Sequence, residues 1–325
     1  MAARQSAPVI GALCSDGEKN LEEQARENSV KHHFDVTIGY RYQDSSRHFV
    51  GTTEQKQREI LRNQVENNYH LFDVAINYQL THRWSLTGSL PILVANRHQG
   101  TGYFHTHGIG DATIGTRAWL FSGERGGNVA LGVSLKMPTG KDNSQDYSFR
   151  NGVRTIITSD QSIQAGDGGW GFALETQGYK RTYFNSVLYF SGAYLFNPKG
   201  TNGVPTFRTQ KGEEIMSVAD QYLYRGGISH AVPKIRGLVA SFGGRMEGVP
   251  VRDAFGSSLG FRRPGYAIDL DPGFVYTRGR NSWSCNVPFA VQRNRTISVP
   301  DLANNRHGDA AFADYALTMS YARHF

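Results

Sequence analysis

The sequence predicts an all-β protein: a transmembrane antiparallel β-barrel of about twelve strands, with a short N-terminal helical or disordered segment. Three observations support this fold class. Long stretches alternate apolar and polar residues, aromatic residues stand at the ends of the apolar faces, and the connectors alternate between short and long. A membrane barrel turns only every second residue toward lipid, so this pattern suits a chain of low mean hydropathy.

Composition narrows the class further. The 325 residues include 37 glycines, 12% are aromatic, and the formal net charge is +7. No apolar run approaches the ~18 residues of a membrane helix, which excludes a helical membrane protein. Lysine and arginine are spread over turns and loops without a basic stripe, so we expect no nucleic acid as a partner.

The beginning of the chain differs from the rest. Residues 1–28 are polar and rich in helix formers, which predicts an N-terminal periplasmic segment at 1–28 and an outer-membrane β-barrel at 29–325. The opening stretch lacks a basic start followed by an apolar core, so we expect that a signal peptide has been removed. The expected location is the bacterial outer membrane.

The alternation recurs along the whole predicted barrel. In one clear segment, Trp283, Cys285, Val287, Phe289 and Val291 share one face, and small or polar residues take the other. Several segments exceed the about five or six residues of a usual soluble strand. We expect strands at about 30–43, 69–80, 83–96, 108–121, 128–138, 169–180, 183–196, 217–230, 236–248, 263–277, 282–293 and 311–325.

The connectors between these strands alternate in length. The short ones are 81–82, 122–127, 181–182, 231–235 and 278–281, and the long ones are 44–68, 97–107, 139–168, 197–216, 249–262 and 294–310. Outer-membrane barrels have short periplasmic turns and long extracellular loops. The even strand number then places both termini at the periplasmic rim. Residues 54–68 are expected to be helical, and the connector 139–168 either folds into the channel or stays a flexible extracellular loop.

Several stretches resemble a known family. They are Gly108 to Asp111, Met137 to Gly140, Gly260 to Tyr266, Val287 to Arg295, and His307 to Tyr315. In them the chain resembles the bacterial outer-membrane transporter-like family named for the meta-pathway of phenol degradation. The resemblance implies an outer-membrane β-barrel and, by association, the passage of small and often aromatic compounds. It supplies no catalytic or binding residues.

The expected partners follow from this class of protein. The chain ends on Phe325 after an alternating strand, an end that the barrel-assembly machinery reads in outer-membrane barrels. We therefore expect that machinery to act through the C-terminal strand. The other expected partners are outer-membrane lipids and small-molecule solutes.

Charged residues on the predicted inner face are candidates for lining the lumen. They are Asp35, Arg41, Asp73, Asp111, Arg117, Lys136, Glu175, Arg225, Arg245, Glu247, Asp269, Asp271 and Asp314. Such charges must be solvated or paired, because an isolated charge in a dry interior is costly. Two compatible interpretations stay open: ion pairs that prop or fill the barrel, and a charged constriction that selects solutes. We expect inward arginines to neutralise the neighbouring carboxylates of Asp269 and Asp271.

Basic residues in the long loops are candidates for the channel mouth. They are Arg208, Lys211, Arg295 and Arg306. A positive rim concentrates anions at low salt and loses this effect as salt increases. We therefore expect a mild anion preference.

Other chemistry has weaker support in the sequence. His98, His105 and His107 could share a metal ion, but a solvated loop explains them better, and we expect no metal and no cofactor. No cluster of the His-Glu-Ser-Asn kind stands out in the sequence, so no catalytic residue is assigned. Cys14 and Cys285 are expected to be free thiols. The predicted function is passive passage of small solutes, aromatic acids among them; the alternatives are a plugged structural or adhesive barrel and a lipid-modifying enzyme.

Overall fold

The fold was analysed in a computed structural model of the whole chain. The structure describes residues 33–100, 102–121, 126–150, 153–183 and 186–325. The predicted N-terminal segment 1–28 and Cys14 lie outside these residues.

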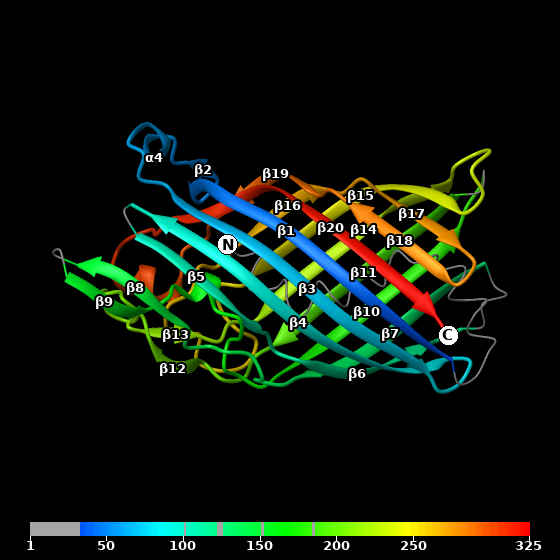
Figure 1. The fold of residues 1–325 in the computed structure, drawn as a ribbon, viewed down its shortest axis with the longest axis horizontal. Helices are drawn as coiled ribbons and strands as arrows, with labels where there is room; N and C mark the ends of the chain where they lie inside the picture. The colour runs from blue at the N-terminus through cyan, green and yellow to red at the C-terminus, as the bar shows by residue number, and fades with distance from the viewer. Residues whose placement is uncertain (1–32, 101, 122–125, 151–152, 184–185) are drawn as a thin grey trace.

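The strands form one closed antiparallel barrel, in which the last strand pairs with the first (Figure 1). Twelve staves make the wall, each an unbroken strand or two strand segments in line. In chain order they are β1 (Phe34–Val50), β3 (Val65–Gln79), β4 (Trp84–Gln99), β5 (Gly102–Ile109) with β6 (Thr113–Trp119), β7 (Gly127–Lys136), β10 (Gly171–Arg181), β11 (Ser186–Phe196), β14 (Gln221–Ala231), β15 (Leu238–Val249), β16 (Gly265–Leu270) with β17 (Gly273–Arg278), β18 (Asn281–Asn286) with β19 (Phe289–Asn294), and β20 (Ala310–His324).

Three staves are interrupted where the sequence predicts unbroken strands. Proline causes two of the breaks, Pro272 between β16 and β17 and Pro288 between β18 and β19, because it has no N–H for the ladder. The third break separates β5 from β6 at Gly110. A Cβ added there would lie 2.9 Å from Pro91 Cγ, so only glycine fits this approach of the chain to β4.

The outer surface carries the apolar face of the alternation. Leu90, Leu131, Phe242 and Phe289 are among the exposed large apolar side chains of the wall, and their sequence neighbours point inward. Exposure of so much apolar wall suits contact with lipid acyl chains. Within the described residues, no helix is both long and apolar enough to cross a membrane.

Aromatic rings gather at the short-turn end of the barrel. The ring of Trp283 lies 5.9 Å from that of Tyr276 and 5.6 Å from that of Tyr321, measured between centroids. Phe325 stacks on Phe34 at 4.6 Å, so the chain ends beside the start of the first described strand. This ring of aromatics matches the girdle that outer-membrane barrels place at a water boundary.

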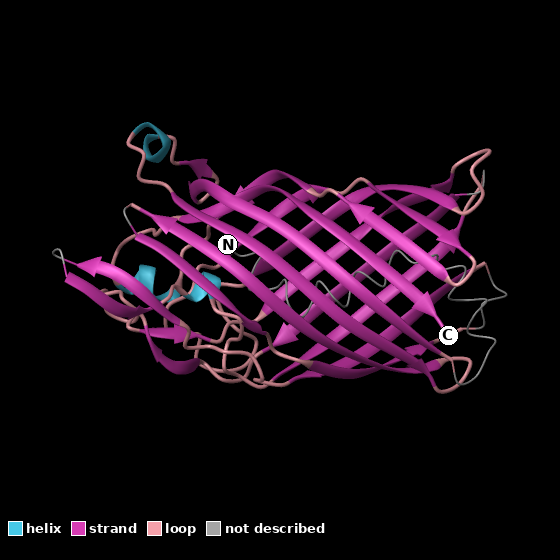
Figure 2. Cartoon of the chain, in the orientation of Figure 1, coloured by secondary structure: helices cyan, strands magenta, loops and turns pink. Residues whose placement is uncertain are grey.

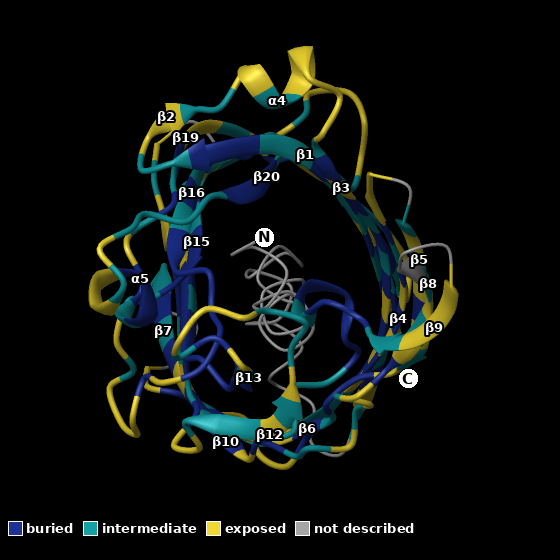
Figure 3. Ribbon diagram, turned by 90° about the vertical axis from the view of Figure 1, so that its left-hand side faces the viewer, coloured by how far each residue is buried: buried dark blue, intermediate teal, exposed yellow. Residues whose placement is uncertain are grey.

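The opposite end carries most of the longer connections and is called the mouth (Figure 2). Its small elements are β2 (Thr53–Glu54), α4 (Gln57–Ile60), β8 (Gln145–Arg150), β9 (Val153–Thr158), η3 (Gln161–Ile163), β12 (Thr201–Pro205), β13 (Ile215–Ser217) and α5 (Val299–Ala303). Seen along the barrel, parts of these loops lie inside the ring of strands (Figure 3).

Two expectations about the connectors are wrong. Residues 97–107 are not a long loop, because β4 and β5 continue as a paired hairpin from Ile92 and Ile109 up to Gln99 and Gly102. Residues 54–68 are not one helix: α4 has four residues, and β3 begins at Val65. The residues from Val65 to Asn68 extend β3 toward the mouth, beyond the apolar band of the outer wall. Polar side chains can point outward there because they face no lipid.

Candidate functional site: the lumen wall and its mouth

The structure places most of the predicted lumen set on the inner wall. Their side chains are buried, and most of them lie in ion pairs in two sectors of the wall. In the first sector Glu247 on β15 binds two arginines. Arg41 Nη2 on β1 lies 2.7 Å from Glu247 Oε1, and Arg245 Nη2 lies 2.8 Å from Glu247 Oε2. Three staves separate β1 from β15 along the wall, so the Arg41–Glu247 pair spans a chord of the lumen.

The two neighbouring aspartates of the first sector differ in their surroundings. Asp271 Oδ2 accepts a hydrogen bond of 2.5 Å from Arg225 Nε, and Asp271 Oδ1 accepts one of 3.3 Å from Asn286. Asp269 lies opposite Arg245 in the β15–β16 register. Inward arginines thus face both carboxylates, as the sequence leads one to expect.

The second sector lies across β6, β7 and β10. Arg117 Nη2 is 3.5 Å from Glu175 Oε2, and Ser134 Oγ donates a 2.7 Å hydrogen bond to Glu175 Oε1. Lys136 pairs with Asp167 of the connector above it. The ammonium of Lys136 therefore ties a mouth loop to the wall.

Asp111 also anchors a loop. Its Oδ1 accepts a hydrogen bond of 2.9 Å from the backbone N–H of Gly140, and its Oδ2 accepts one of 3.0 Å from that of Asp167. A Cβ on Gly166 would lie 2.8 Å from Asp111 Oδ1, so glycine is required for this approach. The break between β5 and β6 thus serves to place one carboxylate under the longest loop.

The remaining members of the set lie on three adjacent staves, β1, β3 and β20. Asp35 Oδ1 is 2.6 Å from His324 Nδ1 near the short-turn end. Asp73 is buried on β3. The side chain of Asp314 is half exposed and binds Arg47 and Arg293, next to a bulge in the β1–β20 pairing, so it differs from the buried members.

The connector between β7 and β10, which contains the predicted loop 139–168, folds inward. Its η3 turn inserts Ile163 into a buried cluster with Tyr69, Leu71, Leu93 and Ala95 of the wall, with Ala165 packed beside it. The side chain of Ile163 is fully buried. Because apolar burial holds the turn against the wall, this loop narrows the mouth rather than standing free above it.

Asp160 fixes that turn from its N-terminal side. It accepts hydrogen bonds of 2.8 and 2.7 Å from Arg263 Nη1 and Nη2, and Arg97 Nη2 lies 3.6 Å away. Burial opposes the negative charge, but the guanidinium groups of Arg263 and Arg97 outweigh it and hold the pKa of Asp160 well below its usual range. The carboxylate is therefore ionised at all physiological pH values.

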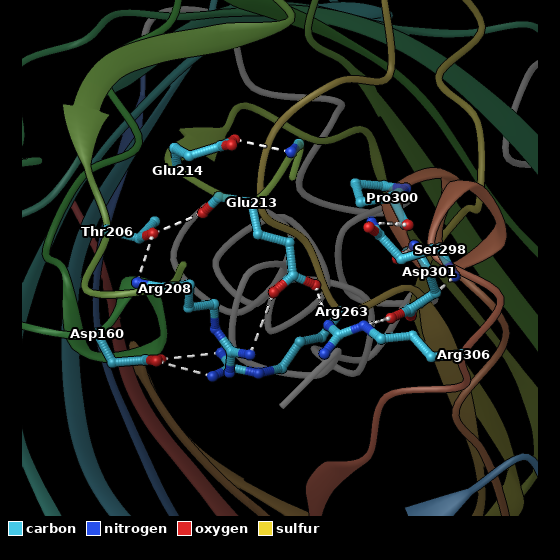
Figure 4. A network of polar contacts seen from close by, with 12 residues as sticks. Asp160, Thr206, Arg208, Glu213, Glu214, Arg263, Ser298, Pro300, Asp301 and Arg306 are labelled. Atoms are coloured by element: carbon cyan, nitrogen blue, oxygen red, sulfur yellow. Dashed lines mark hydrogen bonds and ion pairs between the residues drawn. The ribbon is translucent and has the colours of Figure 1, made fainter. Parts of the chain in front are cut away.

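The predicted mouth arginines are paired rather than free. Arg208 Nη1 lies 3.3 Å from Glu213 Oε2, and Arg306 binds the other oxygen of Glu213 (Figure 4). Arg295 Nη2 lies 2.9 Å from Asp301 Oδ2. Lys211, the fourth member, has an exposed side chain. The carboxylates that bind these arginines, Glu213 and Asp301, are not among the candidates from the sequence, and no local pattern marks them.

The histidines considered as metal ligands, His98, His105 and His107, lie within the described residues. No cluster of three or more potential metal ligands occurs among the described residues. His105 Nδ1 bonds Asn96, and His98 Nδ1 is 4.0 Å from Glu66. His48 pairs with Asp309 in the manner of a catalytic dyad, but its Nε2 already accepts a 2.9 Å hydrogen bond from a backbone N–H.

Comparison with known proteins supports the fold class. No family model matches the sequence, and no curated protein matches it. An outer membrane channel from Pseudomonas putida F1 is similar in structure, with a TM-score of 0.60 and 12% identity, over 91% of this chain and 96% of that chain. The translocator domain of the autotransporter NalP from Neisseria meningitidis has a TM-score of 0.52 and 11% identity, over 99% of this chain and 97% of that one. The chain therefore has the fold of bacterial outer-membrane barrels.

Proposed function

We propose that this protein is a passive channel through which small, water-soluble solutes cross the outer membrane, with aromatic acids among them. The ionised inner wall carries the proposal. Arg41 with Glu247 and Arg225 with Asp271 form close, buried arginine–carboxylate pairs, which suits a lumen that holds polar solutes and some water. The inward loop at η3 supplies the narrowing that lets such a wall select by size.

Liposome swelling tests the proposal. Vesicles that contain the purified protein should swell with benzoate and small sugars faster than protein-free vesicles, and the rate should fall with solute size. Swelling equal to that of protein-free vesicles for every solute would contradict a channel.

A plugged structural barrel is a second candidate, because two contacts cross the lumen. The Arg41–Glu247 pair joins distant staves, and the Arg263–Asp160 pair joins the base of β16 to the loop that packs on β3 and β4. In that case replacing Asp160 by asparagine should leave the vesicles impermeable. We also propose that the protein is not an enzyme; a lipase or deacylase assay on outer-membrane lipids tests this separately.

A further inference from the structure

Arginines and carboxylates alternate in one chain of contacts across the mouth. On one side Asp160 lies between Arg97 and Arg263. On the other side Glu213 lies between Arg208 and Arg306, and Asp301 lies between Arg306 and Arg295. The side chains come from β4, the β7–β10 loop, the β12–β13 turn, the start of β16 and the loop that holds α5 (Figure 4).

The alternation fails at one place. Arg263 and Arg208 both lie against the ring of Phe261, with their Cζ atoms 4.4 and 3.9 Å from its centroid. Each pairs with its own carboxylate, Arg263 with Asp160 and Arg208 with Glu213, and both lie against the same ring. Two positive groups therefore adjoin in the middle of the chain.

The charges in this chain of contacts do not cancel. Five guanidinium groups share three carboxylates, which leaves a positive surplus in a largely buried network. Burial and the charge of Arg263 lower the pKa of Arg208 to about 10, as expected where like charges meet. Uncompensated charge in such surroundings is costly unless an anion or water approaches it.

Arg208 and Arg306 are the members that an anion can reach. Their side chains are 26% and 31% exposed, whereas those of Arg97, Arg263 and Arg295 are buried. Of these two, Arg208 is the one that lies with Arg263 against the ring of Phe261. The Nε of Arg208 makes no hydrogen bond among the described residues but is itself buried, so an anion can approach only the exposed part of the guanidinium group. The planar guanidinium group matches the two oxygens of a carboxylate.

We propose that Arg208, beside Arg263 at the ring of Phe261, forms a binding site in the mouth for the carboxylate of a small organic acid. The site rests on the proposed function and gives it a solute class. It differs from a diffuse positive rim, because the surplus is located at one pair of side chains. Charges of the predicted wall set are more often acidic than basic, so an anion preference must arise at the mouth.

The test uses Arg208→Gln with Lys211→Gln as the matched control. Both changes remove one positive charge from the same loop, but Lys211 is exposed and binds no member of the chain of contacts in the described structure. Glu213 keeps Arg306 when Arg208 is replaced, so no buried carboxylate is left unpaired. Benzoate is the probe, and benzyl alcohol is its uncharged analogue.

The first measurement is benzoate-dependent block of the potassium chloride current in planar bilayers. Wild type and Lys211→Gln should be blocked at similar benzoate concentrations, Arg208→Gln should need about tenfold more, and benzyl alcohol should block none of them. Equal block of wild type and Arg208→Gln would overturn the site. Equal weakening by both substitutions would also overturn it, in favour of a diffuse field.

The second measurement separates this inference from the proposed function. Thermal unfolding in detergent should shift upward with benzoate for wild type and Lys211→Gln but not for Arg208→Gln, whether or not the protein conducts. A protein that conducts without any benzoate shift or block contradicts the site alone. A protein that shows the shift but no current contradicts the channel and leaves the site supported.

Discussion

Replacement of a lipid-facing residue by arginine should cost stability according to its depth in the membrane. Phe289 is 40% exposed on the outer wall and lies six residues beyond Trp283 of the aromatic girdle. At ~3.3 Å per residue and a tilt of ~40°, it stands roughly 15 Å above Trp283, near the middle of a ~25 Å lipid-facing band. Phe289→Arg should therefore lower the free energy of unfolding by about 2–4 kcal/mol.

Phe274 and Ala290 provide the comparison. Phe274 pairs with Cys285, two residues beyond Trp283, so it stands only about 5 Å from the girdle, and Phe274→Arg should cost about 1 kcal/mol. Ala290 adjoins Phe289 but faces inward opposite Asp269. Ala290→Arg should cost about 1 kcal/mol or less, because a carboxylate and lumenal water receive the charge.

The assay is reversible urea unfolding of the protein in lipid vesicles, followed by tryptophan fluorescence. Phe289→Arg should lower the free energy of unfolding the most. Phe274→Arg and Ala290→Arg should lower it by similar, smaller amounts. Equal costs at Phe289 and Ala290 would show that the two faces are wrongly assigned. Equal costs at Phe289 and Phe274 would show that the girdle does not mark the membrane boundary.

Further predictions concern the mouth and the ends of the chain. Arg262 and Asp253 form a fully buried pair, so Arg262→Met should leave a buried carboxylate unpaired and lower the free energy of unfolding by about 3–5 kcal/mol. In a double-mutant cycle, adding Asp253→Asn should restore part of the lost stability. Burial opposes ionisation of Asp309, but His48 and Arg58 hold its pKa at about 2, below its ordinary 3.8. The contribution of the ionised Asp309 to stability is therefore present above about pH 4 and lost as the pH falls toward about 2. This loss should be absent when the unfolding of Asp309→Asn is measured against pH. Cys285 shares the outward face of β18 with Trp283, so a membrane-permeable maleimide should label it in vesicles and a charged maleimide should not. A tag after Phe325 should resist protease added to intact cells, and its digestion would reverse the predicted orientation.

The wall of the barrel could be predicted from the sequence because its signal is local. Alternation with period two assigns a face to each residue from its neighbours alone, and it correctly turned Arg41, Glu247 and Asp271 inward. The same local reading missed the breaks at Pro272 and Pro288, since the alternating pattern continues through them. It also began β3 too late, at Tyr69 instead of Val65, because the strand rises above the lipid band and loses its apolar face there.

The network at the mouth could not be predicted in the same way. Arg263 and Asp160 are 103 residues apart, and Arg41 and Glu247 are 206 residues apart. Such pairs depend on how loops from different staves meet inside the barrel, which no local pattern encodes. The sequence could offer Arg208, Arg295 and Arg306 as basic loop residues, but not the carboxylates that bind them.

Single-channel recording in planar bilayers tests the central claim, that this barrel conducts, most directly. Purified protein in potassium chloride should give discrete current steps of uniform size. Asp160→Asn should enlarge or destabilise the open level, because it releases the η3 turn from Arg263. Insertion of folded protein without any current steps, in wild type and in Asp160→Asn alike, would contradict the account and leave a closed structural barrel.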